Sequence, residues 1–188
     1  MAELIIFLGL FGLLLIVLLM SKTNNLKKKY NKTTEAFGGV DAYLQQRYDL
    51  IPNLIASVKK LMEYESELFT ELAKLNTLSK QHDIPIQEKI RINSQIDTRY
   101  SQVQVFVNEH PQISANEQVS YVMSEWVRME DNILAARRVY NSNVTEYNDA
   151  YDSFPNSLIA NLIGLDRAVV FEAVAEARVA PKGEDLWN

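Results

Sequence analysis

The chain contains no cysteine, which excludes several classes of site at once. Without a thiol it cannot carry a lipid-modified cysteine, a disulfide framework or a thiolate-bound metal ion. It also contains only two histidines, His82 and His110. Neither has a glutamate three residues before it, so the Glu-x-x-His motif of di-metal carboxylate bundles is missing.

Motifs of other enzyme classes are missing as well. The sequence has no His-Glu-x-x-His zinc motif, no phosphate-binding glycine loop and no Gly-x-Ser-x-Gly nucleophile elbow. Glu63 and Glu67 lie one helical turn apart, but an exposed acidic helix face explains such a pair better than a catalytic dyad. We therefore expect no enzymatic activity, no metal and no cofactor.

Basic residues are few beyond the first 30 residues. Four of the 19 lysines and arginines are Lys22, Lys27, Lys28 and Lys29, which leaves 15 against 23 acidic residues in 31–188, a net charge of −8. An acidic surface repels phosphate backbones, and nucleic-acid binding needs a segregated basic face that these scattered residues do not supply. We expect no nucleic-acid partner.

Residues 4–20 form an apolar run without a charge. At about 1.5 Å per residue the run covers roughly 25 Å, slightly short of a hydrocarbon core of about 30 Å, and the Lys22 stem can make up the difference. The alternative is a cleaved signal peptide, which needs a basic segment before the run and small residues after it. Glu3 precedes the run and Met20 ends it, so the sequence favours an uncleaved membrane anchor.

The lysines that follow the run predict its orientation. By the positive-inside bias they place the bulk of the chain in the cytoplasm and the short N-terminus outside. We expect a single-pass membrane protein.

Beyond the anchor, apolar residues recur every three or four positions, which predicts amphipathic helices that pack together. The first such stripe begins at Leu26 and reaches Arg47 or Tyr48, and the later helices are expected over 51–75, 86–107 and 119–151. Short connections then give an antiparallel up-and-down four-helix bundle in an all-α fold. The predicted regions are an anchor (1–21), the bundle (22–152), a C-terminal amphipathic segment (153–178) and a mobile tail (179–188).

The helix ends are predicted from capping chemistry. Asp49 can cap the second helix with Pro52 in its first turn, although one long kinked helix through Pro52 is the alternative. The third helix should begin at an Asp cap before a proline, and the fourth should begin with a capping box. Asp83 with Pro85 should begin the third helix, and His110 with Pro111 should end it. Ser114 with Glu117 should begin the fourth helix, and Pro155 should end it.

The fourth helix should return to the membrane and bring residues 154–165 near it. Gly164 is the expected C-cap of this short amphipathic segment. The segment can lie in the lipid interface, pack on the end of the bundle or contact a second subunit. The predicted membrane or subunit interface consists of Phe154, Leu158, Ile159, Leu162 and Ile163.

Three charged residues fall on the apolar stripes themselves: Glu65, Glu130 and Arg137. Opposite charges buried at one level of a bundle should pair, and removing one partner would leave the other charge buried at a cost of several kcal/mol. We predict that the three form a buried polar network that fixes helix register. The functional alternative is a proton relay or a ligand site in a bundle cavity.

One string of residues carries a family resemblance. Arg-Tyr-Asp-Leu-Ile-Pro-Asn-Leu at 47–54 is specific, and Ala-Arg-Arg at 136–138 and Ser-Phe-Pro-Asn at 153–156 follow in order. In these strings the chain resembles the LemA family of bacterial membrane-anchored proteins. The resemblance implies one membrane span, a cytoplasmic four-helix bundle and no established enzymatic activity. The chain departs from the family at Phe37, where tryptophan is usual, and at Gly38 and Gly39, which lower helix propensity by about 1 kcal/mol each.

Two functions fit these observations. The first is a non-enzymatic interaction module, held at the membrane, that assembles with itself as a homo-oligomer or scaffolds other membrane proteins. The second is a regulatory adaptor of a membrane enzyme such as a metalloprotease, since in some bacteria LemA proteins appear alongside one.

Overall fold

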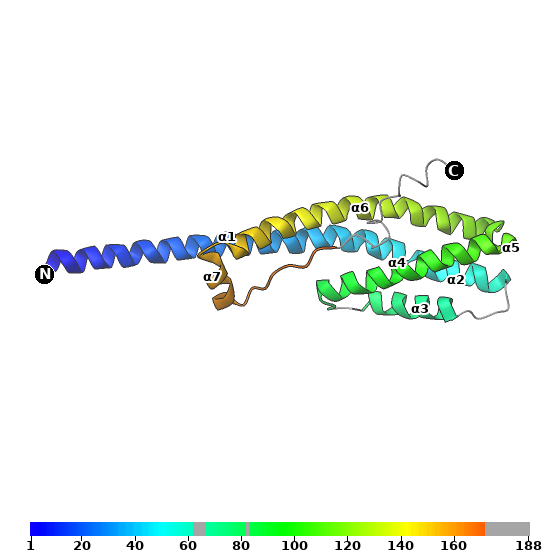
Figure 1. Cartoon of the computed structure of the whole chain (residues 1–188), viewed down its shortest axis with the longest axis horizontal. Helices are drawn as coiled ribbons and strands as arrows, with labels where there is room; N and C mark the ends of the chain where they lie inside the picture. The colour runs from blue at the N-terminus through cyan, green and yellow to red at the C-terminus, as the bar shows by residue number, and fades with distance from the viewer. Residues whose placement is uncertain (62–66, 82, 172–188) are drawn as a thin grey trace, which may run out of the picture. The chain divides into compact units, whose positions relative to one another are not determined.

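The structure is a computed structural model that describes residues 1–61, 67–81 and 83–171. Throughout those ranges every regular element is a helix, which confirms the predicted all-α class: a long apolar N-terminal helix followed by several packed helices. The predicted tail, 179–188, lies outside the described residues. The helices are α1 (Ala2–Tyr48), α2 (Leu50–Leu61), α3 (Glu67–Ser79), α4 (Ile86–Glu109), α5 (Pro111–Ser114), α6 (Glu117–Asp152) and α7 (Asn156–Ile163) (Figure 1).

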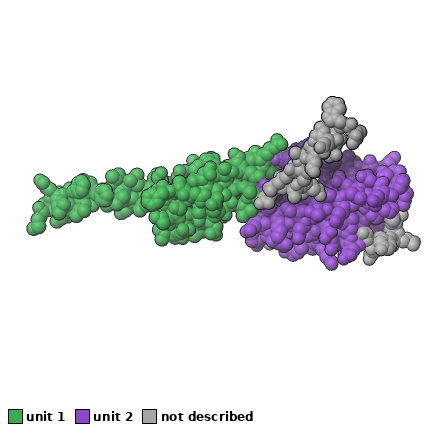
Figure 2. Space-filling view, in the orientation of Figure 1, with its two compact units in different colours: residues 1–40, 135–170 green, residues 41–134, 171–188 purple. Residues whose placement is uncertain are grey.

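The chain divides into two compact units (Figure 2). Unit 1 contains Met1–Val40 and Ala135–Val170, and the described residues of unit 2 are 41–61, 67–81, 83–134 and Phe171. Helices α1 and α6 each contribute residues to both units. The anchor, the bundle and the C-terminal segment that we predict are consecutive stretches of sequence, whereas each unit combines two separate stretches. The predicted boundaries stay predictions.

The apolar run is the first part of α1. Its large side chains are 44–69% exposed from Leu4 to Met20, and an 18-residue stretch of the helix has a mean hydropathy of 3.0 with none of it buried. This part of α1 is therefore long and apolar enough to cross a membrane, a test that signal sequences near an N-terminus also pass.

In unit 1, α1 packs against α6 along the predicted stripe. Tyr30 meets Tyr147 edge to face at 5.4 Å, and Phe37 meets Tyr140 at 5.5 Å. A later residue of α1 thus contacts an earlier residue of α6, so the two helices are antiparallel within the unit. The buried side chains on this stretch of α1 are Leu26, Thr33, Phe37 and Val40, spaced by three, four and seven residues.

Polar side chains of α6 hold the segment that follows α7. The Tyr140 hydroxyl donates to the Val169 carbonyl and the Tyr147 hydroxyl to the Asp166 carbonyl, both at 2.7 Å. Asn148 bonds the Ala168 backbone twice, as donor at 2.9 Å and as acceptor at 3.0 Å. Burial raises the pKa of both tyrosines to about 12, so their hydroxyls keep the donor proton into alkaline solution. The chain after α7 is therefore fastened along α6.

Two C-terminal predictions are confirmed in the same unit. Helix α6 ends at Asp152, before Pro155, and Gly164 caps α7 with a left-handed backbone (φ 67°) and an N–H that donates to the Ala160 carbonyl. Glycine suits this position because it has no Cβ to oppose a positive φ.

In unit 2, the junction of α1 and α2 is a single residue, Asp49. Its N–H still donates to the Gln45 carbonyl at 3.1 Å, as in a continuous helix. Pro52 is tolerated because it stands in the first turn of α2. The Asp49 carboxylate accepts from Lys80 Nζ at 2.6 Å.

In unit 2 the chain does not turn back at Pro52: α2 continues α1 through Asp49, which is the alternative of one long helix, and α3 is the helix that runs back. Asp41 pairs with Lys89 at 2.7 Å and Arg47 with Asp97 at 2.6 Å, so the last turns of α1 run parallel to α4. Helix α3 is antiparallel to α4. Its contacts are Phe69 with Phe106 at 5.5 Å between ring centroids and Glu71 with Arg99 at 2.8 Å.

Two of the predicted N-caps are wrong. Asp83 has a left-handed backbone (φ 62°), whereas an N-cap residue usually has an extended one. The N-cap position of α4 is Pro85, and no side chain caps this helix. The capping box of Ser114 and Glu117 does not form because the short helix α5 uses Ser114, whose hydroxyl donates to the Pro111 carbonyl. The cap of α6 is Asn116, whose Oδ1 accepts from the N–H groups of Gln118 and Val119 at 3.0 and 3.1 Å.

Deleting residues 1–21 should leave a soluble, folded helical protein, because the apolar stretch of α1 buries no surface within the chain. We expect strong helical circular dichroism and a cooperative melt. An unfolded truncated protein would show that the folded part depends on the anchor or on neighbouring subunits.

Replacing Gly38 or Gly39 by alanine should stabilise the protein. Both glycines lie inside α1, and a Cβ added at either position meets no atom within 4 Å. Each substitution should raise the free energy of unfolding by about 0.5–1 kcal/mol, measured by thermal or urea denaturation. Gly164→Ala is the matched control and should destabilise, because of its positive φ. Equal effects at Gly38 and Gly164 would contradict the backbone argument.

Candidate interaction site

The centre of unit 2 contains a buried charge, Arg47. It stands in the last turn of α1, three residues after the buried Leu44 and seven after Val40, so helical periodicity directs it to the core. Its side chain is 0% exposed. A guanidinium group stays protonated in proteins, so the core must provide partners for a permanent cation.

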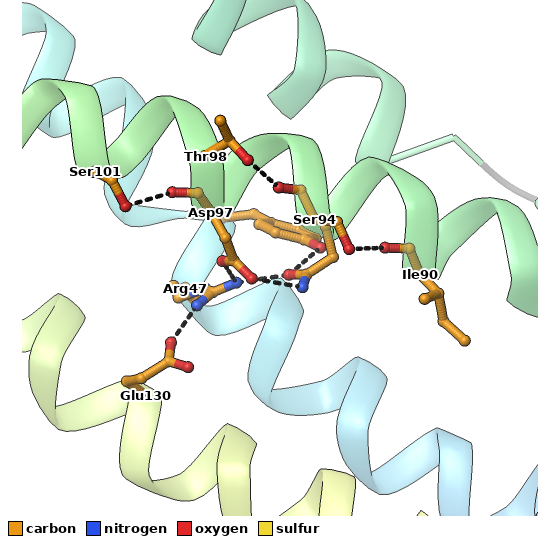
Figure 3. A network of polar contacts seen from close by, with 9 residues as sticks. Arg47, Ile90, Ser94, Asp97, Thr98, Ser101 and Glu130 are labelled. Atoms are coloured by element: carbon orange, nitrogen blue, oxygen red, sulfur yellow. Dashed lines mark hydrogen bonds and ion pairs between the residues drawn. The ribbon is translucent and has the colours of Figure 1, made fainter. Parts of the chain in front are cut away.

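The partners of Arg47 come from two other helices (Figure 3). Nη1 donates to Glu130 Oε2 on α6 at 2.5 Å, and Nη2 donates to Asp97 Oδ1 on α4 at 2.6 Å. Nη2 also donates to Asn93 Oδ1, which accepts a second bond from the Tyr48 hydroxyl at 3.2 Å. We call Arg47, Asn93, Asp97 and Glu130 the arginine cluster.

Aromatic rings cover one side of the arginine cluster. The guanidinium carbon of Arg47 lies 4.8 Å from the centroid of the Trp126 ring, within cation–π distance. Trp126 in turn stacks on Tyr100 with 3.8 Å between centroids and 7° between planes. Burial raises the pKa of Tyr100, and the nearby Glu130 carboxylate adds to the increase while Arg47 opposes it. The phenol is thus kept neutral beside the cluster.

The arginine cluster joins α1, α4 and α6 by charge as well as by packing. One cation faces two carboxylates, and the Asp97 and Glu130 side chains keep 16% and 35% of their surface exposed, so water also reaches these carboxylates. Because a buried charge is costly when its partners are misplaced, this arrangement favours one register of the three helices.

A groove between α4 and α6 opens beside the arginine cluster. Its volume is about 580 Å³, and its floor includes Tyr100 and Trp126. Val105 and Val127 on its sides are each 57% exposed. The hydroxyls of Thr98 and Ser101 are bonded to carbonyls of their own helix at 3.0 and 3.1 Å. The groove is lined by Asp97, Thr98, Tyr100, Ser101, Gln102, Gln104, Val105, Trp126, Val127 and Glu130.

A smaller hollow of about 390 Å³ lies between α3 and α4. The ion pair of Glu71 and Arg99 crosses it at 2.8 Å, and Lys74 and Leu75 add to its lining. The α4–α6 groove is the larger of the two and alone borders the arginine cluster.

The predicted network of Glu65, Glu130 and Arg137 is only partly described. Glu65 lies outside the described residues, and Arg137 is half-buried in unit 1. Glu130 accepts a hydrogen bond from Arg47, which was not part of the predicted network. Sequence reasoning placed Arg47 on the apolar stripe but did not select it as the central cation. The pairing of Glu65 with Arg137 stays a prediction.

The predicted interface residues separate onto two faces of the C-terminal region. Ile159 is buried and Ile163 is half-buried, so these two pack on unit 1. Phe154, Leu158 and Leu162 are exposed. Their role as a membrane or subunit interface stays a prediction.

Within residues 1–61, 67–81 and 83–171, no three His, Asp or Glu side chains lie close enough together to bind a metal ion. His110 ends α4, with its Nδ1 at 2.7 Å from the Phe106 carbonyl and its ring 4.3 Å from the Phe106 ring. His82 lies outside the described residues.

These features define a class: helical proteins with a long apolar N-terminal helix and a charged cluster inside the packed helices. The chain matches the LemA family over residues 36–183, and it belongs to that family. The match begins beyond the apolar run and includes every residue of the arginine cluster. A search of curated proteins found no match.

Replacing Arg47 by lysine should destabilise the protein by about 2 kcal/mol or more, because an ammonium group cannot reach Glu130, Asp97 and Asn93 from one planar fork. Arg128→Lys is the matched control. Arg128 pairs with Glu125 one turn away on the exposed face of α6, and its replacement should leave stability almost unchanged. Urea denaturation measures both. Small effects of similar size at the two positions would show that the hydrogen bonds of the Arg47 guanidinium group do not stabilise the fold.

Proposed function

We propose that the protein is a non-enzymatic, membrane-anchored interaction module of the bacterial inner membrane. Its folded part lies in the cytoplasm, where it assembles with itself or scaffolds other membrane proteins. The observation that carries the proposal is the continuity of α1: one helix begins in the apolar run and continues into the packed helices up to Tyr48. A folded part attached in this way is held at the bilayer without a flexible linker.

The orientation rests on charge. Lys22, Lys27 and Lys28 are exposed on α1 directly after the apolar run. Cytoplasmic flanks are enriched in lysine and arginine, so this side of the anchor should face the cytoplasm.

The α4–α6 groove is the surface that we expect to bind protein. It combines apolar side chains, Val105, Trp126 and Val127, with the carboxylates of Asp97 and Glu130. Grooves between helices that expose apolar side chains commonly receive an amphipathic helix of a partner. The Thr98 and Ser101 hydroxyls in the groove bond carbonyls of their own helix, which fits a binding role better than nucleophilic catalysis.

A second candidate is a regulatory adaptor of a membrane enzyme such as a metalloprotease. The carboxylates of Asp97 and Glu130 in the groove lining favour it, because they suit a basic helix of a different protein better than a second copy of this acidic chain.

Purification of the full chain in mild detergent should separate the two candidates. For the interaction module we expect a mass of several chains, measured by light scattering, and Val127→Glu should reduce it because a charge in the groove opposes apolar contact. Leu134→Glu is the matched control, since Leu134 is 41% exposed on α6 and does not line the groove.

The identity of the co-purified proteins distinguishes the adaptor from the interaction module. A stoichiometric membrane protease that Val127→Glu releases would favour the adaptor. A single chain with no partner, unaffected by Val127→Glu, would overturn the proposal.

A further inference from the structure

Helix α7 exposes an apolar face in unit 1. Leu158 is 58% exposed and Leu162 86%, and their spacing of four residues places them on one side of the helix. Phe154, in the turn before the helix, is 83% exposed. The opposite side is buried, with Ile159 at 6% and Ala160 at 0% exposure. Helix α7 itself contains no charged residue. Such a face costs free energy in water unless it is covered.

Contacts within unit 1 place α7 beside the end of the apolar run. Ala160 clusters with Leu26 of α1 and Tyr147 of α6. Leu26 follows Met20 by six residues, which is about 9 Å along a helix. If Lys22 completes the span, the distance is about 6 Å. A headgroup layer is about 5–7 Å thick, so α7 stands at the level where this layer meets α1.

The direction of α7 also fits a bilayer surface. In Figure 1, α7 runs across the direction of α1 rather than along it. A helix that crosses the anchor lies in the membrane plane when the anchor spans the membrane. Amphipathic helices in that orientation bury their apolar face about 5–10 Å deep at the boundary of headgroups and acyl chains.

Lysines of α1 supply the positive charge that α7 lacks. Lys22, Lys27 and Lys28 are exposed within six residues of Leu26. Near a membrane surface, lysines attract anionic lipid headgroups. The neighbouring Lys29 is occupied by an ion pair with Glu146.

We propose that α7 is a second membrane contact: Phe154, Leu158 and Leu162 insert into the headgroup region of a bilayer that contains anionic lipid. This inference rests on the proposed anchoring of α1. With two contacts, the anchor cannot rotate or tilt freely, so the folded part is held in a fixed orientation to the membrane.

The absence of cysteine makes a direct test simple, because one introduced cysteine is a unique labelling site. The full chain carrying Leu162→Cys is labelled with bimane and reconstituted into vesicles of phosphatidylcholine and phosphatidylglycerol with brominated acyl chains. Leu13→Cys, in the apolar run, is the positive control. Val127→Cys, exposed on α6, is the negative control.

We expect the brominated lipid to quench bimane at Leu162→Cys and at Leu158→Cys, and not at Val127→Cys. Quenching at Leu13→Cys without quenching at Leu158→Cys or Leu162→Cys would overturn the α7 proposal and leave the anchor intact. No quenching at Leu13→Cys would overturn the anchor and, with it, the proposed function. Protection of Leu162→Cys from aqueous iodide without quenching by lipid would show that a second subunit covers the face, which also overturns the lipid proposal.

Discussion

The packing of unit 2 depends on keeping one permanent cation out of water. Arg47 is fully buried, and its two Nη atoms reach side chains from α4 and α6 at 2.5–2.6 Å. A buried ion pair seldom adds net stability over an apolar replacement of the same shape, but it strongly penalises any register in which the partners separate. The cluster therefore favours one register of α1, α4 and α6. The α4–α6 groove shares Asp97 and Glu130 with the cluster, so its shape depends on the same register.

Unit 1 is held together by contacts of a different kind. Its contacts are mainly aromatic and hydroxyl to carbonyl, with Tyr140 and Tyr147 each packing on α1 by the ring and bonding the chain after α7 by the hydroxyl. One side chain thus fastens two segments. These bonds hold residues 166–169 along α6, and Ala160 of α7 packs beside Leu26.

The stripes from Leu26 to Leu44 and the ends at Asp152 and Gly164 were predictable, since they depend on local periodicity and local chemistry. Asn116 was missed because Ser114 and Glu117 match a capping box, whereas Ser114 is the last residue of α5 and its hydroxyl bonds the Pro111 carbonyl. The arginine cluster was missed because Asn93 and Asp97 stand on a weakly periodic helix, and no local pattern indicates which distant helix supplies a carboxylate. For the same reason the sequence could not tell which apolar residues of α7 would be buried.

A double-mutant cycle between Arg47 and Asp97 tests most directly whether the arginine cluster holds these helices together. The free energy of unfolding is measured for Arg47→Met, for Asp97→Leu and for the double variant. The account predicts that each single variant loses stability, Arg47→Met because Asp97 and Glu130 lose their cation and Asp97→Leu because Arg47 Nη2 loses a carboxylate acceptor. The double variant should lose less than the sum of the two, with a coupling of about 2 kcal/mol or more. Effects that add to within about 0.5 kcal/mol would contradict it, because independent side chains behave in that way.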